Sequence, residues 1–249
     1  MVAFYGGSHR LQSAVRMIFP PECVSCRAPV DTEFALCGDC WRDTPFIVGA
    51  VCDQCGTPVP QGDEADEDLR CDDCLRKPPP WSRGRAAVLY SDNARSMVLG
   101  LKHGDRQDLA RPMSEWMARA ARPILQKDML VTSVPLNRWR LLKRRYNQSA
   151  LLAQRIAQDA GLDYCPDLML RPRATPKLDG KDAAAREETV SGALKLHPRH
   201  RDRAHGRHVL IVDDVMTSGA TLSEATHILR AAGARNVSVL VFARVAKEP

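Results

Sequence analysis

Eight cysteines between residues 23 and 74 form the densest group of potential metal ligands in a sequence that has nine cysteines in all. They fall into four Cys-x-x-Cys pairs: Cys23 and Cys26, Cys37 and Cys40, Cys52 and Cys55, Cys71 and Cys74. Such a pair places two thiolates on one side of a tight turn, and two pairs complete a tetrahedral site for Zn²⁺. Because four thiolates leave no coordination position open to water, zinc bound here would be structural rather than catalytic.

Disulfides and redox-active CxxC motifs are the alternatives to zinc. The N-terminal residues lack a signal-peptide pattern, so we expect a cytoplasmic protein, in which thiols stay reduced. Four CxxC motifs in so short a segment are too many for a redox-active site. The spacing favours one site built from the first and second pairs and another from the third and fourth, while a crossed arrangement or a single occupied site also fits. The sequence therefore predicts one or two structural zinc ions.

A second group of reactive side chains lies at residues 209–222, which read VLIVDDVMTSGATL. The apolar run Val209–Val212 predicts a buried strand that delivers Asp213 and Asp214 to the edge where open α/β sheets bind ligands. The following residues turn into a helix whose first N–H groups, with nearby hydroxyls, would bind an anion: Thr217, Ser218, Gly219, Ala220 and Thr221. Carboxylates beside an anion site suit the hydroxyls of a ribose, so the segment fits a sugar phosphate.

The elements that must position these groups alternate between strands and helices. Strand-like runs lie at residues 86–90, 130–134, 209–212 and 237–243, and helical patterns lie at 97–101, 109–125, 147–160 and 221–232. A strand–helix–strand order predicts parallel pairing, and thus an α/β fold with a parallel sheet flanked by helices. Even the longest apolar run is far shorter than a spanning helix requires, so we expect no membrane insertion.

Charge and proline content divide the chain. Residues 1–80 carry seven Lys and Arg against thirteen Asp and Glu, whereas residues 81–249 carry a net charge of +12. The three prolines at 78–80 would stiffen the chain into an extended spacer between these parts. We therefore predict three segments: a helical lead-in at 1–22, a double zinc ribbon at 23–77 and a larger domain at 81–249. The basic domain suggests a phosphate-rich ligand, nucleotide or nucleic acid, or else a solvated basic surface.

The order of these parts resembles the ComF family of competence-associated proteins, over nearly all of residues 20–245. Residues 209–222 resemble the signature with which type I phosphoribosyltransferases bind 5-phosphoribosyl 1-pyrophosphate (PRPP). Further matches are Leu101-Lys102-His103-Gly104-Asp105, Val134-Pro135-Leu136, Tyr146-Asn147-Gln148 and Ser191-Gly192-Ala193. The resemblance implies a type I phosphoribosyltransferase fold after the zinc ribbon, with PRPP and Mg²⁺ as ligands.

The resemblance also implies roles for single residues. Asp213 and Asp214 would contact the ribose hydroxyls, with Asp214 as the candidate acid or base, and residues 217–221 would hold the 5-phosphate. The pyrophosphate would lie on a loop and a nearby cation: Pro135, Leu136, Arg138 and Lys102. Residues 171–192 would form a hood over the site, although they have neither the Gln at 175–179 nor the Asn at 187–189 that the family shows.

Three functions follow as hypotheses. The first is a phosphoribosyltransferase, in which pyrophosphate leaves C1 of the ribose and a nitrogen nucleophile attacks. The second is an accessory protein that binds single-stranded DNA and acts with DNA-uptake proteins. The third is a PRPP sensor without catalysis. No residue pattern selects an acceptor or an oligomeric state.

Three further features have two interpretations each. The basic run Arg140, Lys143, Arg144 and Arg145 fits a phosphate or nucleic-acid contact, or a solvated turn. The histidine- and arginine-rich segment 197–208 fits metal or DNA binding, but a solvated linker is the simpler interpretation. Cys165 is most simply a small buried residue.

Overall fold

The computed structural model describes residues 19–60, 68–103, 106–174 and 183–245. The helix predicted within the lead-in at 1–22 lies almost entirely outside the described residues, as does part of the predicted hood. The chain divides into two compact units, residues 1–44 and 45–249. Within the described residues, no helix is both long and apolar enough to cross a membrane.

The first unit carries the first four cysteines. A bridge between Glu22 and Pro29 closes the turn that holds the first cysteine pair. Helix α2 (Gly38–Asp43) begins directly after Cys37, and its first turn carries Cys40. A turn and a short helix thus supply one CxxC pair each.

The second unit is built around a five-stranded sheet in the order β1-β7-β6-β2-β3, with every neighbouring pair parallel. The strands are β1 (Arg83–Leu89), β2 (Leu130–Ser133), β3 (Asp163–Tyr164), β6 (His208–Met216) and β7 (Asn236–Arg244). The central strands are buried along most of their length, as expected for a parallel sheet covered on both faces. A separate antiparallel pair joins β4 (Met169–Leu170) to β5 (Lys195–Leu196).

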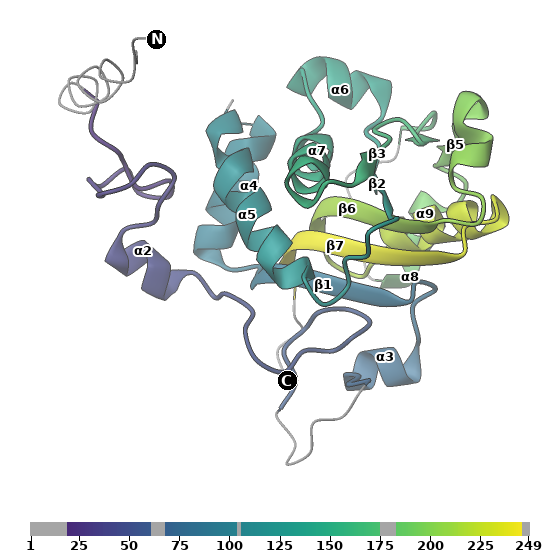
Figure 1. Ribbon diagram of the computed structural model, residues 1–249, viewed down its shortest axis with the longest axis horizontal. Coiled ribbons are helices and arrows are strands. Elements are labelled where there is room, and N and C mark those ends of the chain that lie inside the picture. The colour runs from purple at the N-terminus through teal and green to yellow at the C-terminus, as the bar shows by residue number, and fades with distance from the viewer. Residues whose placement is uncertain (1–18, 61–67, 104–105, 175–182, 246–249) are drawn as a thin grey trace, which may run out of the picture. The chain divides into compact units, whose positions relative to one another are not determined.

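Helices cover both faces of the sheet (Figure 1). The helical elements of this unit are α3 (Asp72–Arg76), α4 (Asp92–His103), η1 (Gln107–Leu109), α5 (Ala110–Ala121), α6 (Arg138–Arg144), α7 (Gln148–Ala160), α8 (Ala183–Val190), η2 (Pro198–Arg203) and α9 (Ala220–Ala231). Helices α5 and α7 pack on each other and on the sheet, while α9 packs on β6 and β7. The predicted α/β fold is therefore confirmed. The basic run at 140–145, for which the sequence analysis considered a solvated turn, forms the short helix α6 up to Arg144.

The second four-cysteine segment packs directly on edge strand β1. The guanidinium of Arg85 in β1, which is 9% exposed, pairs with Asp53 at 2.5 Å between Nη2 and Oδ1. The backbone of Gly56, at φ +71°, lies so close to β1 that a Cβ there would stand 2.7 Å from the Ala86 nitrogen. Cys52 belongs to the same apolar cluster as residues of β6 and β7.

The compact units therefore divide the chain between the two cysteine clusters, and not at the prolines. The reason is physical, since the second ribbon shares its core with the sheet. The domain division at 1–22, 23–77 and 81–249 stays a prediction, because compactness and independent folding are different properties.

Candidate functional site

The two adjacent carboxylates lie within β6, which continues two residues beyond them to Met216. Asp214 is buried, and Lys102 from the end of α4 contacts it at 3.1 Å between Nζ and Oδ1. The side-chain amide of Gln148 donates to the other oxygen of Asp214 at 2.7 Å. The hydroxyl of Ser149 donates to Asp213 at 2.8 Å. The site is thus assembled from β6, α4 and the first turn of α7.

The start of α7 is held in place by its N-cap. The side chain of Asn147 accepts a hydrogen bond from the Ser149 N–H and donates one to the Val134 carbonyl, at 3.1 and 3.0 Å. The Val134 N–H in turn donates to Val212 of β6 at 3.0 Å. Asn147 therefore fixes the first turn of α7 to the end of β2, which brings Gln148 and Ser149 to the carboxylates.

Burial, together with the charge of Asp214, raises the pKa of Asp213 to about 7. The hydrogen bonds from Ser149 and from the Asp214 N–H, and the charge of Lys102, act in the opposite direction. A carboxyl with this pKa gains or loses its proton near neutral pH, as a general acid or base does. The sequence analysis gave that role to Asp214, and this assignment stays a prediction.

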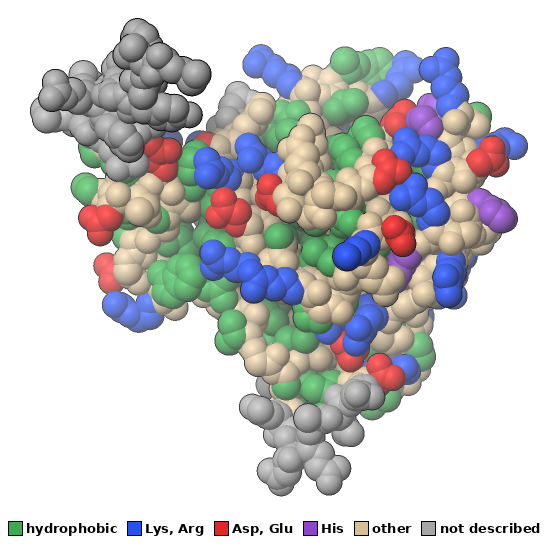
Figure 2. Space-filling model, in the orientation of Figure 1, with side chains coloured by type: hydrophobic (Ala, Val, Ile, Leu, Met, Phe, Trp, Pro, Cys, Tyr) green, Lys and Arg blue, Asp and Glu red, His purple; other side chains and the backbone are tan. Residues whose placement is uncertain are grey.

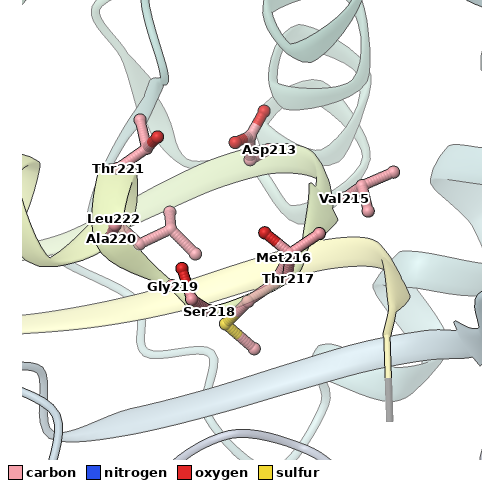
Figure 3. A pocket seen from close by; sticks show the side chains of 9 residues that line it. All are labelled: Asp213, Val215, Met216, Thr217, Ser218, Gly219, Ala220, Thr221 and Leu222. Atoms are coloured by element: carbon pink, nitrogen blue, oxygen red, sulfur yellow. The ribbon is translucent and has the colours of Figure 1, made fainter. Parts of the chain in front are cut away.

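The predicted phosphate loop joins β6 to α9 and lines a pocket that is open to solvent (Figure 3). Gly219 is the N-cap of α9 and has a φ of +80°, a conformation that side chains disfavour. The pocket is lined by one of the carboxylates and by the loop: Asp213 and residues 215–222. An anion there would meet the N–H groups and positive dipole end of a twelve-residue helix.

Two residues outside the predicted phosphate loop, Trp81 and Arg244, contact it. The indole ring of Trp81, which is 4% exposed, lies so close to Gly219 that a Cβ there would stand 2.8 Å from its Cη2 atom. The indole N–H of Trp81 donates to the Gln54 carbonyl of the second ribbon at 2.5 Å. The guanidinium of Arg244, at the end of β7, donates to the carbonyls of Met216 and Thr217. The buried Trp81 ring therefore connects the second ribbon to the predicted phosphate loop.

The predicted pyrophosphate loop follows β2 at the same edge of the sheet. Pro135 is buried and Leu136 half-buried, and Asn137 caps α6 by accepting from the Trp139 N–H at 3.1 Å. Arg138 is exposed, and its guanidinium lies over the Trp139 ring, 4.9 Å from the centroid. The structure thus places Pro135 and Leu136 beside β6, while the Arg138 side chain is directed to Trp139 instead of the carboxylates.

Two other arginines lie in the electrostatic reach of the carboxylates. Burial lowers the pKa of Arg144, and the charge of Asp214 opposes this effect. Burial and the charge of Arg140 lower the pKa of Arg171, and Asp213 opposes them. Both guanidiniums stay protonated because their ordinary pKa is far above neutral. The carboxylates therefore lie among positive side chains that could also bind a pyrophosphate group.

The eight cysteines form two separate clusters of four. One consists of Cys23, Cys26, Cys37 and Cys40, the other of Cys52, Cys55, Cys71 and Cys74, with the sulfurs of each within 4.8 Å of one another. Sulfurs of different pairs stand 3.6 Å apart in each cluster, Cys26 with Cys37 and Cys55 with Cys71, which is close to the edge of a zinc tetrahedron. The sequential pairing is therefore confirmed, and both clusters fit structural zinc, which would contribute folding free energy and no catalytic chemistry.

Comparison with known proteins agrees with both parts of the molecule. Residues 14–75 match the family described as double zinc ribbon domain, and residues 171–249 match the family described as phosphoribosyl transferase domain. The DNA utilization protein YhgH of Salmonella typhimurium is 32% identical over 232 residues, which cover 90% of this chain and 97% of that protein. Competence protein F of Haemophilus influenzae is 24% identical over 228 residues, 89% and 96% of the two chains. Competence protein ComFC of Bacillus subtilis is 24% identical over 220 residues, 84% of each chain.

The chain belongs to the ComF family. The fold implied by that membership is the one observed, a zinc ribbon followed by a phosphoribosyltransferase sheet. In this ComF-family chain the structure brings together Asp213, Asp214, Lys102 and the 217–221 loop, as the sequence analysis expected.

Several residues of the ComF site were not identified from the sequence. Gln148 belongs to a segment that was recognised only as a resemblance, and Ser149 follows that segment, although the Asn147 N-cap before an apolar helix was a usable signal. Arg144 was left open between a phosphate contact and a solvated turn. Trp81, Arg171 and Arg244 gave no local signal, because their contacts with the site depend on tertiary packing.

Proposed function

We propose that this ComF-family protein binds PRPP with Mg²⁺ at residues 213–221 and takes part in the uptake or use of DNA. The observation that supports the proposal best is the pair of carboxylates fixed by Lys102, Gln148 and Ser149 beside a glycine-containing helix N-terminus. The printed names of the relatives, DNA utilization and competence proteins, supply the biological setting.

In this proposal each part of PRPP has its own partners. The 5-phosphate would occupy the pocket formed by residues 217–221, and the ribose hydroxyls would donate to Asp213 and Asp214. The pyrophosphate would lie between the 134–136 loop and the positive charges of Lys102 and Arg144. Mg²⁺ prefers oxygen ligands, so Asp213, which is mostly buried but still reached by solvent, fits it, and the ion would neutralise charge on the departing pyrophosphate.

If the protein catalyses transfer, it would do so mainly by positioning the reactants and stabilising the leaving group. Pyrophosphate would leave C1 of the ribose through a state with oxocarbenium character, and an amine or ring nitrogen would attack the opposite face. Lys102, Arg144 and the loop N–H groups would stabilise the leaving group in a site prepared before the reaction. Asp213, with its pKa of about 7, would hold or release a proton beside the ribose.

Calorimetric titration of the zinc-loaded protein with PRPP and Mg²⁺ tests the binding site. Each charged hydrogen bond to a ribose hydroxyl is worth about 1.5–3 kcal/mol, so Asp213→Asn combined with Asp214→Asn should weaken binding at least ~100-fold. Asp159→Asn, the same change at an exposed position of α7, is the matched control. Unchanged affinity in the double variant would refute the assignment.

A pyrophosphate-release assay then separates an enzyme from a sensor. Release on addition of nitrogen nucleophiles supports transferase activity. Binding without release across a set of nucleobases and amines would leave a PRPP-sensing protein.

A second function, binding of single-stranded DNA, is favoured by helix α6. Trp139 is 63% exposed and Leu142 is 70% exposed, and the helix also carries Lys143 and Arg138 on its exposed surface. Figure 2 shows hydrophobic and basic side chains gathered where α6 lies. An exposed indole beside positive charges is a platform on which a base could stack. The overall content of aromatic residues gave no indication of this platform.

Fluorescence anisotropy of a labelled thymidine oligomer tests this second function. One stacked base is worth about 1–3 kcal/mol, so Trp139→Ala should weaken binding roughly 5- to 150-fold. Trp41→Ala removes another exposed indole, 52% exposed, from the first unit and serves as the control. Affinity should also fall steeply as salt rises, and a flat salt dependence would exclude binding through phosphates.

A further inference from the structure

A third cluster of metal-ligating side chains lies outside both ribbons. Cys165 directly follows β3, Asp167 lies in the turn before β4, and His200 lies in η2. One donor atom of each lies within 4.8 Å of the other two. Strand β4 leads into the 171–192 segment, and β5 leads out of it towards η2, so the cluster joins both ends of that segment's stem.

The distances are close to those around a bound zinc ion. His200 Nε2 stands 3.1 Å from Asp167 Oδ1, and Cys165 Sγ stands 3.9 Å from the same oxygen. Nitrogen, oxygen and sulfur ligands at about 2.0–2.3 Å from tetrahedral zinc stand about 3.3–3.6 Å from one another. Two of the three edges of the cluster therefore already match a zinc site to within about half an ångström.

Burial in the cluster is graded in a way that suits a site open on one side. The side chain of Asp167 is 53% exposed and that of His200 is 24% exposed, so a metal ion has access from solvent. Cys165 is 1% exposed and closes the site on the inner side. The solvent side leaves room for water as a fourth ligand.

His197 is a neighbour of the cluster and not a ligand. Its Nδ1 accepts a hydrogen bond from the Arg199 N–H at 3.1 Å, so the proton of the neutral ring lies on Nε2. That nitrogen faces Asp167 Oδ2 at 4.0 Å. A protonated nitrogen does not bind a metal, and at 4.0 Å it makes no hydrogen bond to the carboxylate.

The positive charge of the two nearest arginines is partly compensated. Arg203 and Arg207 both pair with Asp163, each at 2.7 Å from Oδ2.

We propose that Cys165, Asp167 and His200 form a third metal site, which binds Zn²⁺ with water as the fourth ligand. Binding replaces the thiol proton of Cys165, which is released to solvent. The ion would connect β3, β4 and η2, and so hold together the stem of the 171–192 segment.

Cobalt absorption tests this site with the full chain, after both ribbons have been filled with zinc. Co²⁺ is the probe, because a thiolate bound to it gives a charge-transfer band in the near ultraviolet. We expect the band to saturate at one equivalent of Co²⁺ and to be absent in Cys165→Ser, while native mass spectrometry still finds the zinc of the ribbons. His200→Asn should raise the Kd for Co²⁺ at least ~100-fold.

His205→Asn, an exposed histidine five positions further along, is the matched control and should leave the Kd unchanged. Two results would overturn the proposal: the wild-type protein gives no band, or the band persists in Cys165→Ser. The His200 substitution keeps the test informative if the buried Cys165→Ser change disturbs folding, because unchanged affinity in His200→Asn also excludes the site. In either case His200 and Asp167 would form an ion pair only.

Discussion

The contact between Trp81 and Gly219 gives the sharpest test of how the phosphate loop is held. Gly219→Ala should lower the free energy of unfolding for two separable reasons. An alanine at φ +80° pays about 1–2 kcal/mol for the left-handed conformation. Its Cβ would also stand 2.8 Å from Cη2 of a buried indole, and overpacking of this kind costs about 1–3 kcal/mol. We therefore expect a total loss of about 2–5 kcal/mol.

A double-mutant cycle separates the two terms. In a Trp81→Phe background the shorter ring removes the atom nearest to Gly219, so Gly219→Ala should cost only its backbone term there. The coupling energy between the two changes should then be about 1–3 kcal/mol. Gly161→Ala is the control, because Gly161 has a φ of +64° and nothing within 4 Å of its Cβ position.

Urea unfolding of the zinc-loaded protein gives the four free energies of the cycle. The control should lose about 1–2 kcal/mol, the backbone term alone. If Gly219→Ala has the same effect in both backgrounds, the indole does not press on the loop. The proposed support of the loop by the second ribbon would then be wrong.

Three other predictions follow from the site. Because the folded-state pKa of Asp213, about 7, lies above the ordinary 3.8, its contribution to stability is full below about pH 4 and is lost as the pH rises towards 7. Asp213→Asn should flatten this part of the pH profile of urea unfolding, and an unaltered profile would contradict the assignment. Lys102→Met should lower the free energy of unfolding by about 2 kcal/mol, less than the loss of a fully buried pair, because Lys102 is 21% exposed. Lys102→Arg should recover most of this loss. A loss below ~0.5 kcal/mol in Lys102→Met would mean that the pair is solvated. Cys55→Ser should weaken PRPP binding and lower the Tm of the second unit, whereas Cys26→Ser in the first unit should leave PRPP binding unchanged; equal effects in calorimetry would refute this difference.

Much of the fold was predictable because its apolar runs are strong local signals. The run 209–212 became the core of β6, and the pattern at 147–160 became α7. The position of Asp213 and Asp214 in β6, and of the glycine-containing turn before α9, was also predictable, because an apolar run, two acidic residues and a glycine are adjacent in the sequence. The spacing of the cysteines favoured sequential pairing but left a crossed arrangement open, and the structure shows the sequential one.

The unpredicted part depends on contacts between distant segments. Trp81 meets Gly219 only because β1 and β6 belong to one sheet, and no local pattern reports that contact. Cys165 is buried as expected, but its closeness to His200 arises from the turn of η2 back towards β3. The prolines before Trp81 were interpreted as a spacer, although the indole that follows them is part of the core.

The two ribbons are copies of one motif in sequence but unequal parts of the molecule. The first forms a compact unit of its own, whereas the second lies beneath the sheet edge and carries the Gln54 carbonyl that fixes Trp81. A truncated protein that begins at residue 45 should therefore keep the predicted phosphate loop in place. One that begins at residue 81 would expose the apolar residues of the sheet that the second ribbon covers. For protein engineering, the natural place to cut, fuse or exchange this chain is between its two four-cysteine clusters, at residues 44 and 45.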